Sequence, residues 1–221
     1  MLARLAHIRN WIFDLDNTLY PASINLFVQV DQRITDYIAI ELGLDQVAAR
    51  TLQKQYFHSR GTTLAGLMAE HGTDPHHYLD FVHNIEMDVL AHDRSLAAAI
   101  ARLPGRKLIF TNADAPYAQR VLARLGLGES FEGIFDIHAT NYVPKPVPEA
   151  YAAMCAAFAI DPAESLFAED MARNLTPAKA IGMTTVWVDN GSEQGPGDAR
   201  DHIDYTTRHI GDWLHEILEA A

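Results

Sequence analysis

Two acidic residues, Asp14 and Asp16, directly follow a short apolar run at residues 11–13. Side chains at positions i and i+2 beyond a strand can point toward one site, where their mutual repulsion raises the pKa of one carboxyl group unless a cation intervenes. Mg²⁺ suits such a pair, because it takes carboxylate oxygens, waters and substrate phosphates as ligands. Taken alone, the same pair is also compatible with two solvated acids that open a turn.

Other polar side chains follow later apolar runs or lie near them: Thr111, Asn112, Lys145, Glu169 and Asp170. Asp170 offers a further carboxylate for a cation, and Lys145 offers a positive charge for phosphate oxygens. The hydroxyl group of Thr111 adds a neutral donor. The agreement of several strand ends favours a site for a divalent cation and a phosphate group over a pair of solvated acids.

These side chains meet only if the apolar runs form neighbouring strands of one sheet. Short apolar runs alternate with helical patterns along the chain, which predicts an α/β fold with a Rossmann-like parallel sheet and helices on both faces. The expected strands lie at residues 11–13, 107–111, 134–137, 165–168 and 184–188. Ligands of open parallel sheets bind at the carboxyl ends of the strands, where the predicted site residues stand.

The alternation stops between residues 20 and 93, where the sequence has no convincing strand pattern. Apolar residues at spacings of three and four predict helices in this segment, at residues 27–42, 45–57 and 75–90. We therefore expect a helical cap domain at residues 20–93, inserted into an α/β core formed by residues 1–19 and 94–221.

Composition restricts the possible partners. The 221 residues are 48% hydrophobic, which allows one large domain or a core with an insertion. The formal charge of −12, from 17 Lys and Arg against 29 Asp and Glu, repels polyanions, so no nucleic acid polymer is expected as a partner. Cys155 is the only cysteine, which excludes an intrachain disulfide. No signal-peptide pattern or membrane-length apolar run is present, so we expect a cytoplasmic protein without a membrane partner.

Four segments resemble, in order, the motifs of the haloacid dehalogenase superfamily, whose members are mostly Mg²⁺-dependent phosphatases: residues 13–19 (FDLDNTL), Thr111-Asn112, Lys145-Pro146 and Glu169-Asp170. The resemblance covers essentially the whole chain, since these proteins often carry a helical cap between their first and second motifs. Further segments are similar to the pyrimidine 5′-nucleotidase branch of this superfamily: residues 16–21 (DNTLYP), 61–67 (GTTLAGL), 109–114 (IFTNAD) and 173–175 (RNL).

The resemblance implies hydrolysis of a nucleoside monophosphate, of the UMP or CMP type, with Mg²⁺ as cofactor. Asp14 is then the nucleophile that forms an aspartyl-phosphate, and Asp16 is the general acid and base. The implied metal ligands are Asp14, the backbone carbonyl of Asp16, Asp170, and Glu169 through a water. The residues implied in binding the phosphoryl group are Thr111, Asn112 and Lys145.

The cap residues that contact the substrate are harder to predict. Tyr56, Thr62 and Thr63 are our candidates, because an aromatic ring can stack on a base and hydroxyl groups can bond its polar edge. Packing between helices explains Tyr56 at least as well. The cap histidines fit no common metal-ligand spacing, and we expect surface or packing roles for His58, His71, His76, His77 and His83.

Several other functions are compatible with the same motifs. A dehalogenase needs neither an acid at position 16 nor a metal, so Asp16 and Asp170 favour phosphoryl transfer. A phosphatase for a sugar phosphate or another small monoester is the main alternative, and a phosphomutase is a further one. A receiver domain also combines acids, a Thr and a Lys around Mg²⁺, but the expected cap favours a turnover enzyme. An inactive homologue is expected to lack one of the motif acids or Lys145, and all are present.

Overall fold

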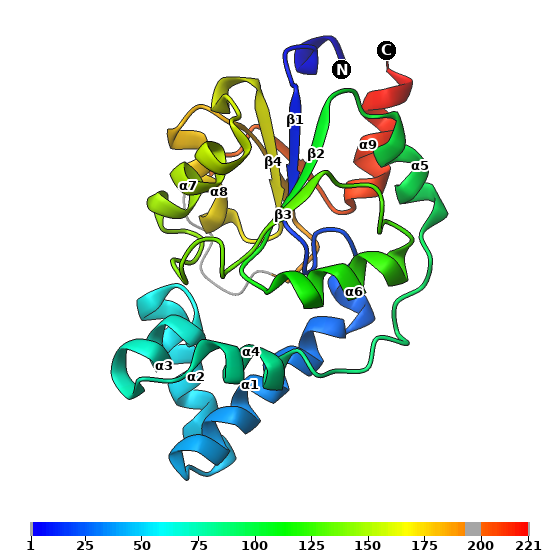
Figure 1. The fold of residues 1–221 in the computed structure, drawn as a ribbon. Coiled ribbons are helices and arrows are strands. Elements are labelled where there is room, and N and C mark those ends of the chain that lie inside the picture. The colour runs from blue at the N-terminus through cyan, green and yellow to red at the C-terminus, as the bar shows by residue number, and fades with distance from the viewer. Residues whose placement is uncertain (1, 193–199, 221) are drawn as a thin grey trace.

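The computed structural model describes residues 2–192 and 200–220 (Figure 1). The described residues form one parallel sheet of six strands, in the order β3-β2-β1-β4-β5-β6. The strands are β1 (Asn10–Phe13), β2 (Arg106–Phe110), β3 (Gly133–Phe135), β4 (Ser165–Glu169), β5 (Thr184–Val188) and β6 (Tyr205–Thr207). The structure confirms the predicted α/β fold and the first five strands. The edge strand β6 was not predicted, because its sequence, Tyr-Thr-Thr, is not an apolar run like those of the other strands.

β1 lies at the centre of the sheet, between β2 and β4. Phe13, the last residue of β1, pairs with Ile109 on one side and with Ala168 on the other. The carboxyl ends of these three strands therefore lie side by side, and the residues that follow them share one edge of the sheet.

Helices cover both faces of the sheet (Figure 1). The helices after the four-helix segment described below are α5 (Arg94–Arg102), α6 (Ala115–Leu125), α7 (Pro148–Phe158), α8 (Ala172–Ala180) and α9 (Ile210–Glu219). Trp11 and Phe13 of β1 pack with residues of α5, α6 and α9, whereas Ile12 packs with residues of α7 and α8. This alternation explains why β1 is apolar throughout: successive side chains enter two different buried layers.

Residues 20–93 are all described and contain no strand. Their helices are α1 (Leu26–Leu42), α2 (Gln46–Arg60), α3 (Thr63–His71) and α4 (Pro75–Val82), and we call residues 26–82 the four-helix segment. This segment lies beyond the carboxyl ends of the strands (Figure 1). It has a hydrophobic core of its own, which includes Ile38, Leu67 and Leu79. The division into two domains at the predicted residues stays a prediction.

Two elements of this segment differ from the sequence prediction. α3 was not predicted as a helix; Thr62 caps it, since its hydroxyl oxygen accepts a hydrogen bond from the N–H of Ala65 at 3.2 Å. α4 ends at Val82 and not near residue 90. The carbonyl oxygen of His83 accepts hydrogen bonds from Arg120 (2.5 Å) and from the N–H of Ile85 (2.9 Å). This oxygen is therefore not bonded by the N–H four residues ahead, as it would be if the helix continued.

The remaining regular elements are short 3₁₀ helices: η1 (Leu2–Leu5), η2 (Ala22–Ile24) and η3 (Pro162–Glu164). Within the described residues, none of the helices combines the length and the apolar character needed to cross a membrane.

Candidate active site

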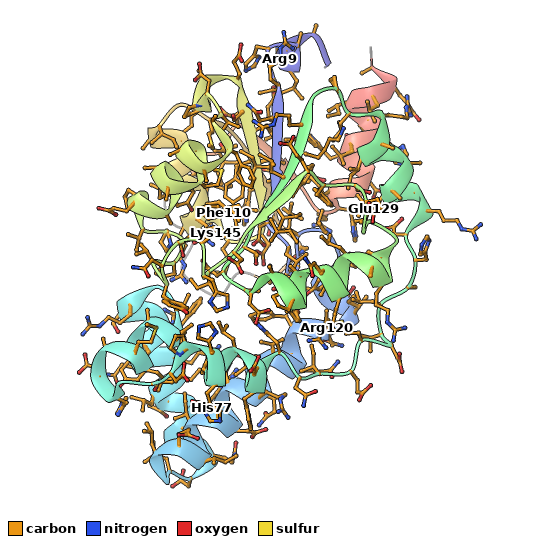
Figure 2. The ribbon with its side chains drawn as sticks, in the orientation of Figure 1. Arg9, His77, Phe110, Arg120, Glu129 and Lys145 are labelled. Atoms are coloured by element: carbon orange, nitrogen blue, oxygen red, sulfur yellow. The ribbon has the colours of Figure 1, made fainter. Side chains whose placement is uncertain are left out.

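A buried lysine joins the predicted motif segments. The Nζ atom of Lys145 lies 2.6 Å from Asp14 Oδ1 and 2.7 Å from Glu169 Oε2, and it donates to the carbonyl oxygen of Phe110 at 2.8 Å. Figure 2 shows Lys145 beside Phe110, at the edge of the sheet that faces the four-helix segment. Lys145 is only 1% exposed, so its charge compensates two carboxylates that are also out of water.

The carboxylates outnumber this one buried cation. Ligand atoms of Asp14, Glu169 and Asp170 all lie within 4.8 Å of one another, and the three residues are buried. Burial, together with the charge of Glu169, raises the pKa of Asp14 to about 7. Burial and the same neighbouring charge raise the pKa of Asp170 well above its usual value. For Glu169, burial acts in the same direction, but the charge of Lys145, together with hydrogen bonds from Lys145, Asp170 and the backbone of Met171, outweighs burial and lowers the pKa.

This cluster fits a divalent cation. Its donors are all oxygens, which suits a hard cation such as Mg²⁺. Three buried carboxylates share one buried lysine, so a bound cation would supply positive charge that the cluster's own residues do not. Asp14, Glu169 and Asp170 are the residues of this cluster that could hold it.

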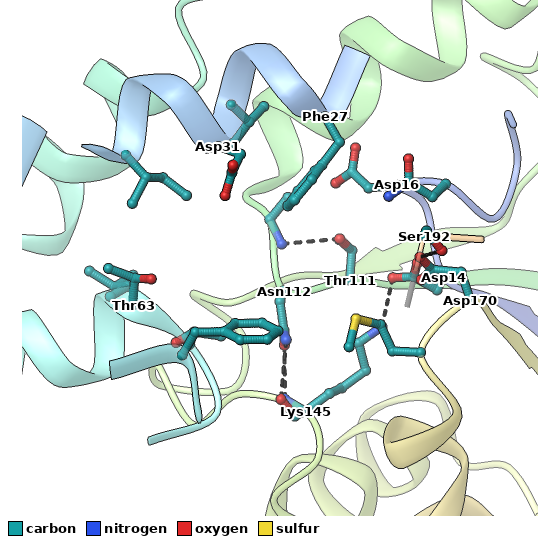
Figure 3. A pocket seen from close by; sticks show the side chains of 18 of the residues that line it. Asp14, Asp16, Phe27, Asp31, Thr63, Thr111, Asn112, Lys145, Asp170 and Ser192 are labelled. Atoms are coloured by element: carbon teal, nitrogen blue, oxygen red, sulfur yellow. Dashed lines mark hydrogen bonds and ion pairs between the residues drawn. The ribbon is translucent and has the colours of Figure 1, made fainter. Parts of the chain in front are cut away.

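Neighbouring side chains fix the orientation of these acids. Figure 3 shows Ser192 beside Asp170 and Asp14. The hydroxyl group of Thr18 donates to Asp14 Oδ2 at 3.1 Å, and the hydroxyl group of Ser192 donates to Asp170 Oδ2 at 2.6 Å. The indole N–H of Trp187 bonds the backbone carbonyl of Asp170 at 2.9 Å. The sequence indicated Thr18, as part of the first motif, whereas Ser192 lies beyond any motif and only the fold brings it to the site.

Asp16 has partners of a different kind. The hydroxyl groups of Tyr20 and Tyr117 both donate to its Oδ1 atom, Tyr117 at 2.7 Å. Burial raises the pKa of Asp16, and the two hydroxyl groups only partly oppose that rise. Burial and the charge of Asp16 raise the pKa of both tyrosines well above the usual value, so both hydroxyl groups stay donors at neutral pH. A carboxyl group in these surroundings is suited to hold and release a proton.

Thr111 and Asn112 lie at the site but differ in what they contact. The Thr111 hydroxyl oxygen accepts the N–H of Ala113 at 3.0 Å. The side chain of Asn112 bonds the backbone of Lys145 twice, donating to its carbonyl oxygen at 3.2 Å and accepting its N–H at 2.8 Å. The Asn112 amide therefore places Lys145, and the phosphoryl contact expected of Asn112 from the sequence stays a prediction.

A cavity of about 350 Å³ separates these residues from the four-helix segment. Asp14, Asp16, Thr111, Lys145 and Asp170 line it on the side of the sheet. Much of the opposite wall is apolar or aromatic: Phe27, Val28, Val30, Ile34, Phe57, Leu64, Tyr78, Leu79 and Val82. The site thus has a charged end at the strands and an apolar end at the helices.

The predicted cap residues divide between this cavity and the helix core. Thr62 and Thr63 line the cavity, although Thr63 already donates its hydroxyl to the carbonyl oxygen of Gln53 at 3.2 Å. Tyr56 does not line it, and the structure corrects this candidate. Its ring packs against Gly66 of α3, and its hydroxyl group lies 2.8 Å from Nε2 of His71. With 7% exposure, Tyr56 belongs to the core between α2 and α3.

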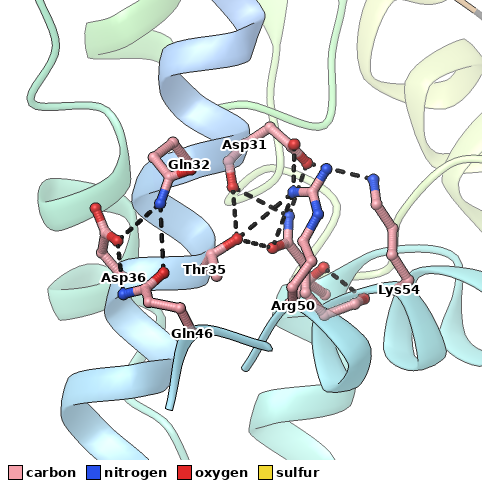
Figure 4. Close-up of polar contacts among 9 residues, drawn as sticks. Asp31, Gln32, Thr35, Asp36, Gln46, Arg50 and Lys54 are labelled. Carbon is pink, nitrogen blue, oxygen red and sulfur yellow. Dashed lines mark hydrogen bonds and ion pairs between the residues drawn. The ribbon is translucent and has the colours of Figure 1, made fainter. Parts of the chain in front are cut away.

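A polar network in the cavity wall was not predicted (Figure 4). Asp31 of α1 accepts hydrogen bonds from Gln53 at 2.8 Å and from Lys54 at 3.4 Å, and it pairs with Arg50. Asp31, Gln53 and Lys54 line the cavity. In the sequence these residues read as ordinary polar positions of two helices, because only the packing of α1 against α2 shows which side faces the cavity.

Arg173 connects the sheet side of the cavity to the helices. The guanidinium group of Arg173 stacks over the ring of Phe57, 4.1 Å from its centroid, and it donates to the carbonyl oxygen of Gly61 at 3.1 Å. Arg173 belongs to the segment RNL, one of those similar to the pyrimidine 5′-nucleotidase branch. Phe57 carried no such signal.

Comparison with known proteins agrees with this fold. A family model described as haloacid dehalogenase-like hydrolase matches residues 8–182. The chain therefore belongs to the haloacid dehalogenase-like hydrolase family.

The relatives that are similar in sequence include the following two. Phosphate metabolism protein 8 of Saccharomyces cerevisiae is 26% identical over 189 residues, which are 78% of this chain but only 59% of the yeast protein. The chain thus spans less than two thirds of the yeast protein's length. Enolase-phosphatase E1 of Shewanella frigidimarina is 30% identical over 170 residues, 72% of this chain and 70% of that protein.

Solved structures share the fold at low identity. A predicted phosphoglycolate phosphatase from Haemophilus somnus has a TM-score of 0.64 and 18% identity, with 95% of this chain and 98% of that chain covered. Both phosphatases and L-2-haloacid dehalogenases occur among the similar structures. The fold alone therefore does not separate these two chemistries.

Proposed function

We propose that this hydrolase is a Mg²⁺-dependent phosphomonoesterase that works through an aspartyl-phosphate. The observation that carries the proposal is the arrangement at the end of β1. Asp14 bonds Lys145 and shares a cluster with Asp170, while Asp16 presents a separate carboxyl group to the same cavity. A halide leaves without a proton and without a metal, so a dehalogenase has no use for Asp16 or for the acid cluster.

In the proposed reaction, a carboxylate oxygen of Asp14 attacks phosphorus, and the bond from phosphorus to the ester oxygen breaks. Asp16 gives its proton to the departing ester oxygen. Asp16 then takes a proton from a water, which attacks phosphorus, releases inorganic phosphate and restores Asp14. Lys145 offsets the negative charge of Asp14 and of the phosphoryl group. Asp14, Asp170, Glu169 and the carbonyl group of Asp16 would hold Mg²⁺, which would supply further positive charge for the phosphoryl oxygens.

As substrate we propose a nucleoside monophosphate, with a pyrimidine 5′-nucleotide as the best fit. The apolar and aromatic wall at the far end of the cavity supports a flat, partly apolar leaving group such as a base. Asp31, Lys54 and the hydroxyl groups of Thr62 and Thr63 offer polar partners for its edge. The similarity to proteins named enolase-phosphatase favours a second candidate, a small phosphorylated metabolite without a base.

The activity is tested with purified protein and Asp14→Asn. We expect wild-type protein to release phosphate from monoesters with Mg²⁺, to stop when EDTA is added, and to recover with excess Mg²⁺. Asp14→Asn should reduce turnover by at least about 10³-fold, because the amide is not a nucleophile. Its circular dichroism spectrum should match that of the wild type. Chelator-insensitive hydrolysis, or an active Asp14→Asn variant, would argue against the assigned site.

Substrate class is tested separately, by a panel that contains UMP, CMP, purine nucleotides and sugar phosphates. For UMP or CMP we expect kcat/KM to exceed that for sugar phosphates by at least about 10-fold, which corresponds to about 1.4 kcal/mol of binding to the leaving group. Equal values across the panel would remove the nucleotidase assignment and leave the phosphatase assignment intact.

A further inference from the structure

The carboxyl group of Asp16 is held at one of its two oxygens. The hydroxyl groups of Tyr20 and Tyr117 both donate to Oδ1, from opposite parts of the chain: Tyr20 follows β1 and Tyr117 lies in the first turns of α6. Among the described residues, no hydrogen bond to Oδ2 is found, while Asp16 lines the cavity. Oδ2 is thus the oxygen left to exchange a proton with a substrate.

Packing around Tyr117 connects this carboxyl group with the four-helix segment. The ring of His83, at the end of α4, stacks on the ring of Tyr117 with centroids 4.3 Å apart and 17° between the planes. His83 Nδ1 lies 3.2 Å from Oδ2 of Asp114. Asp114 caps α6 and accepts the backbone N–H of Tyr117 at 2.8 Å. The ring of Tyr117 is therefore placed from both sides, by its own helix and by His83.

A further contact fixes His83 itself. Arg120, one turn beyond Tyr117 on α6, donates to the carbonyl oxygen of His83 at 2.5 Å. Figure 2 shows Arg120 on α6, toward the side of the four-helix segment. His83 is 7% exposed, and Tyr117 is 1% exposed. Two buried rings with polar contacts at their edges have little freedom to shift.

We propose that Tyr20 and Tyr117 are positioning residues for proton transfer by Asp16, and that His83 holds Tyr117 in place from the four-helix segment. The inference rests on the proposed phosphomonoesterase activity. The hydroxyl groups hold Oδ1, so that Oδ2 delivers its proton to the ester oxygen as the bond to phosphorus breaks. Proton delivery then depends on α4 being seated against α6.

Leaving groups of different basicity separate this role from simple packing. The p-nitrophenolate ion leaves readily without a proton, whereas the 5′-alkoxide of a nucleoside needs one. The ratio of kcat/KM for UMP to kcat/KM for p-nitrophenyl phosphate therefore reports on proton delivery up to phosphoenzyme formation. Because both values are measured on one preparation, the fraction of folded enzyme cancels in this ratio.

We expect Tyr117→Phe and Tyr20→Phe to lower this ratio by at least about 10-fold, while p-nitrophenyl phosphate hydrolysis changes little. The matched control is Tyr151→Phe, which removes another buried hydroxyl group, one that donates to the carbonyl oxygen of Asn174. Tyr151→Phe should leave the ratio unchanged. An equal loss on both substrates for the Tyr20 and Tyr117 variants would overturn the proposal.

His83 is tested with two substitutions. His83→Phe keeps a flat ring against Tyr117 and should keep the ratio near the wild-type value, whereas His83→Ala removes the stack and should lower it. An unchanged ratio in His83→Ala would overturn the part of the proposal that involves His83. If the wild-type protein hydrolyses neither substrate, the phosphomonoesterase proposal itself fails, which is a different result from an active enzyme with an unaltered ratio.

Discussion

The carboxyl group of Asp14 is more costly to ionise in the folded protein than in the unfolded chain. Its pKa rises from 3.8 to about 7, chiefly through burial and secondly through Glu169. Between these two values the folded state binds more protons than the unfolded state, so stability falls as the pH rises. The contribution is complete below about pH 4 and is lost as the pH passes 7.

We therefore predict that, in EDTA, the free energy of unfolding decreases between pH 5 and pH 7, with a slope of up to about 1.4 kcal/mol per pH unit for each proton involved. Mg²⁺ should reduce this slope, because it binds the ionised carboxylates. Urea unfolding at several pH values, with EDTA or with Mg²⁺, measures both effects. Asp14→Asn provides the control, since its slope in EDTA should be smaller; an identical slope would show that Asp14 does not carry the effect.

Lys145 is the cation that pairs with the buried carboxylates of Asp14 and Glu169. Burial alone would lower its pKa, but Asp14 and Glu169 outweigh burial and raise it. We predict that Lys145→Gln destabilises the protein by about 3 kcal/mol in EDTA, because it leaves two buried carboxylates without a partner. Mg²⁺ should restore part of this loss.

Urea unfolding of the Lys145 variant is best compared with Lys179→Gln. Lys179 also pairs with a carboxylate, that of Asp204, but its side chain is 39% exposed. Its loss should cost less than about 1 kcal/mol, whether or not Mg²⁺ is present. Equal costs for the two variants would contradict the role given to burial at Lys145.

The site residues that could be predicted are those with local signals. Asp14 directly follows one apolar run, and the pair Glu169-Asp170 follows another. A parallel sheet brings such positions together whatever the details of packing. Tyr117 and Asp31 carry no local signal. The hydrogen bond from Tyr117 to Asp16 depends on how α6 meets the loop after β1, and the place of Asp31 at the cavity depends on how α1 meets α2. Both are decided by tertiary packing.

Among the elements, strands buried on both faces were easier to predict than the short helices of the four-helix segment. α3 has only nine residues and begins at the second of two threonines, so its helical period is brief. The prediction that Tyr56 contacts the substrate was wrong for a related reason. Its burial depends on the close approach of α2 and α3, which glycine at position 66 permits and which no spacing in the sequence reveals.

The close packing of α2 against α3 leads to a prediction for Gly66→Ala. A Cβ atom at Gly66 would lie 2.3 Å from Cγ of Tyr56, so α2 and α3 must move apart. We expect a loss of about 1–3 kcal/mol of stability. Thermal or urea unfolding measures it, and Gly128→Ala is the control, because a Cβ atom there meets nothing within 4 Å. A Gly66→Ala variant as stable as the control would show that the two helices are not tightly packed.

For the whole molecule, the sequence indicated a helical segment set into an α/β fold, but not how far the two share a core. The structure shows that the helical segment and the sheet share part of one hydrophobic core. Leu26 and Val30 of α1, with Met87 and Leu90 after α4, belong to the same hydrophobic cluster as Trp11 and Phe13 of β1. The four-helix segment is thus anchored at both ends in the core of the sheet, and its own cluster also includes Ile137 from the loop after β3.

A shared core predicts one cooperative unfolding transition. The tryptophans report on the sheet and its covering helices, since Trp11 lies in β1, Trp187 in β5 and Trp213 in α9. Circular dichroism reports on all helices, including α1 to α4. We expect the urea curves from tryptophan fluorescence and from circular dichroism to coincide in the wild type.

A substitution inside the four-helix segment makes this test sharper. Leu67 is 1% exposed and belongs to the hydrophobic cluster of the four-helix segment, not to that of the sheet, so Leu67→Ala should cost about 2–5 kcal/mol there. If the molecule unfolds as one unit, the fluorescence midpoint must shift to lower urea together with the circular dichroism midpoint, although no tryptophan lies in the segment. A fluorescence midpoint that stays in place while the circular dichroism curve splits would mean that the four-helix segment unfolds on its own, as an independent lid can.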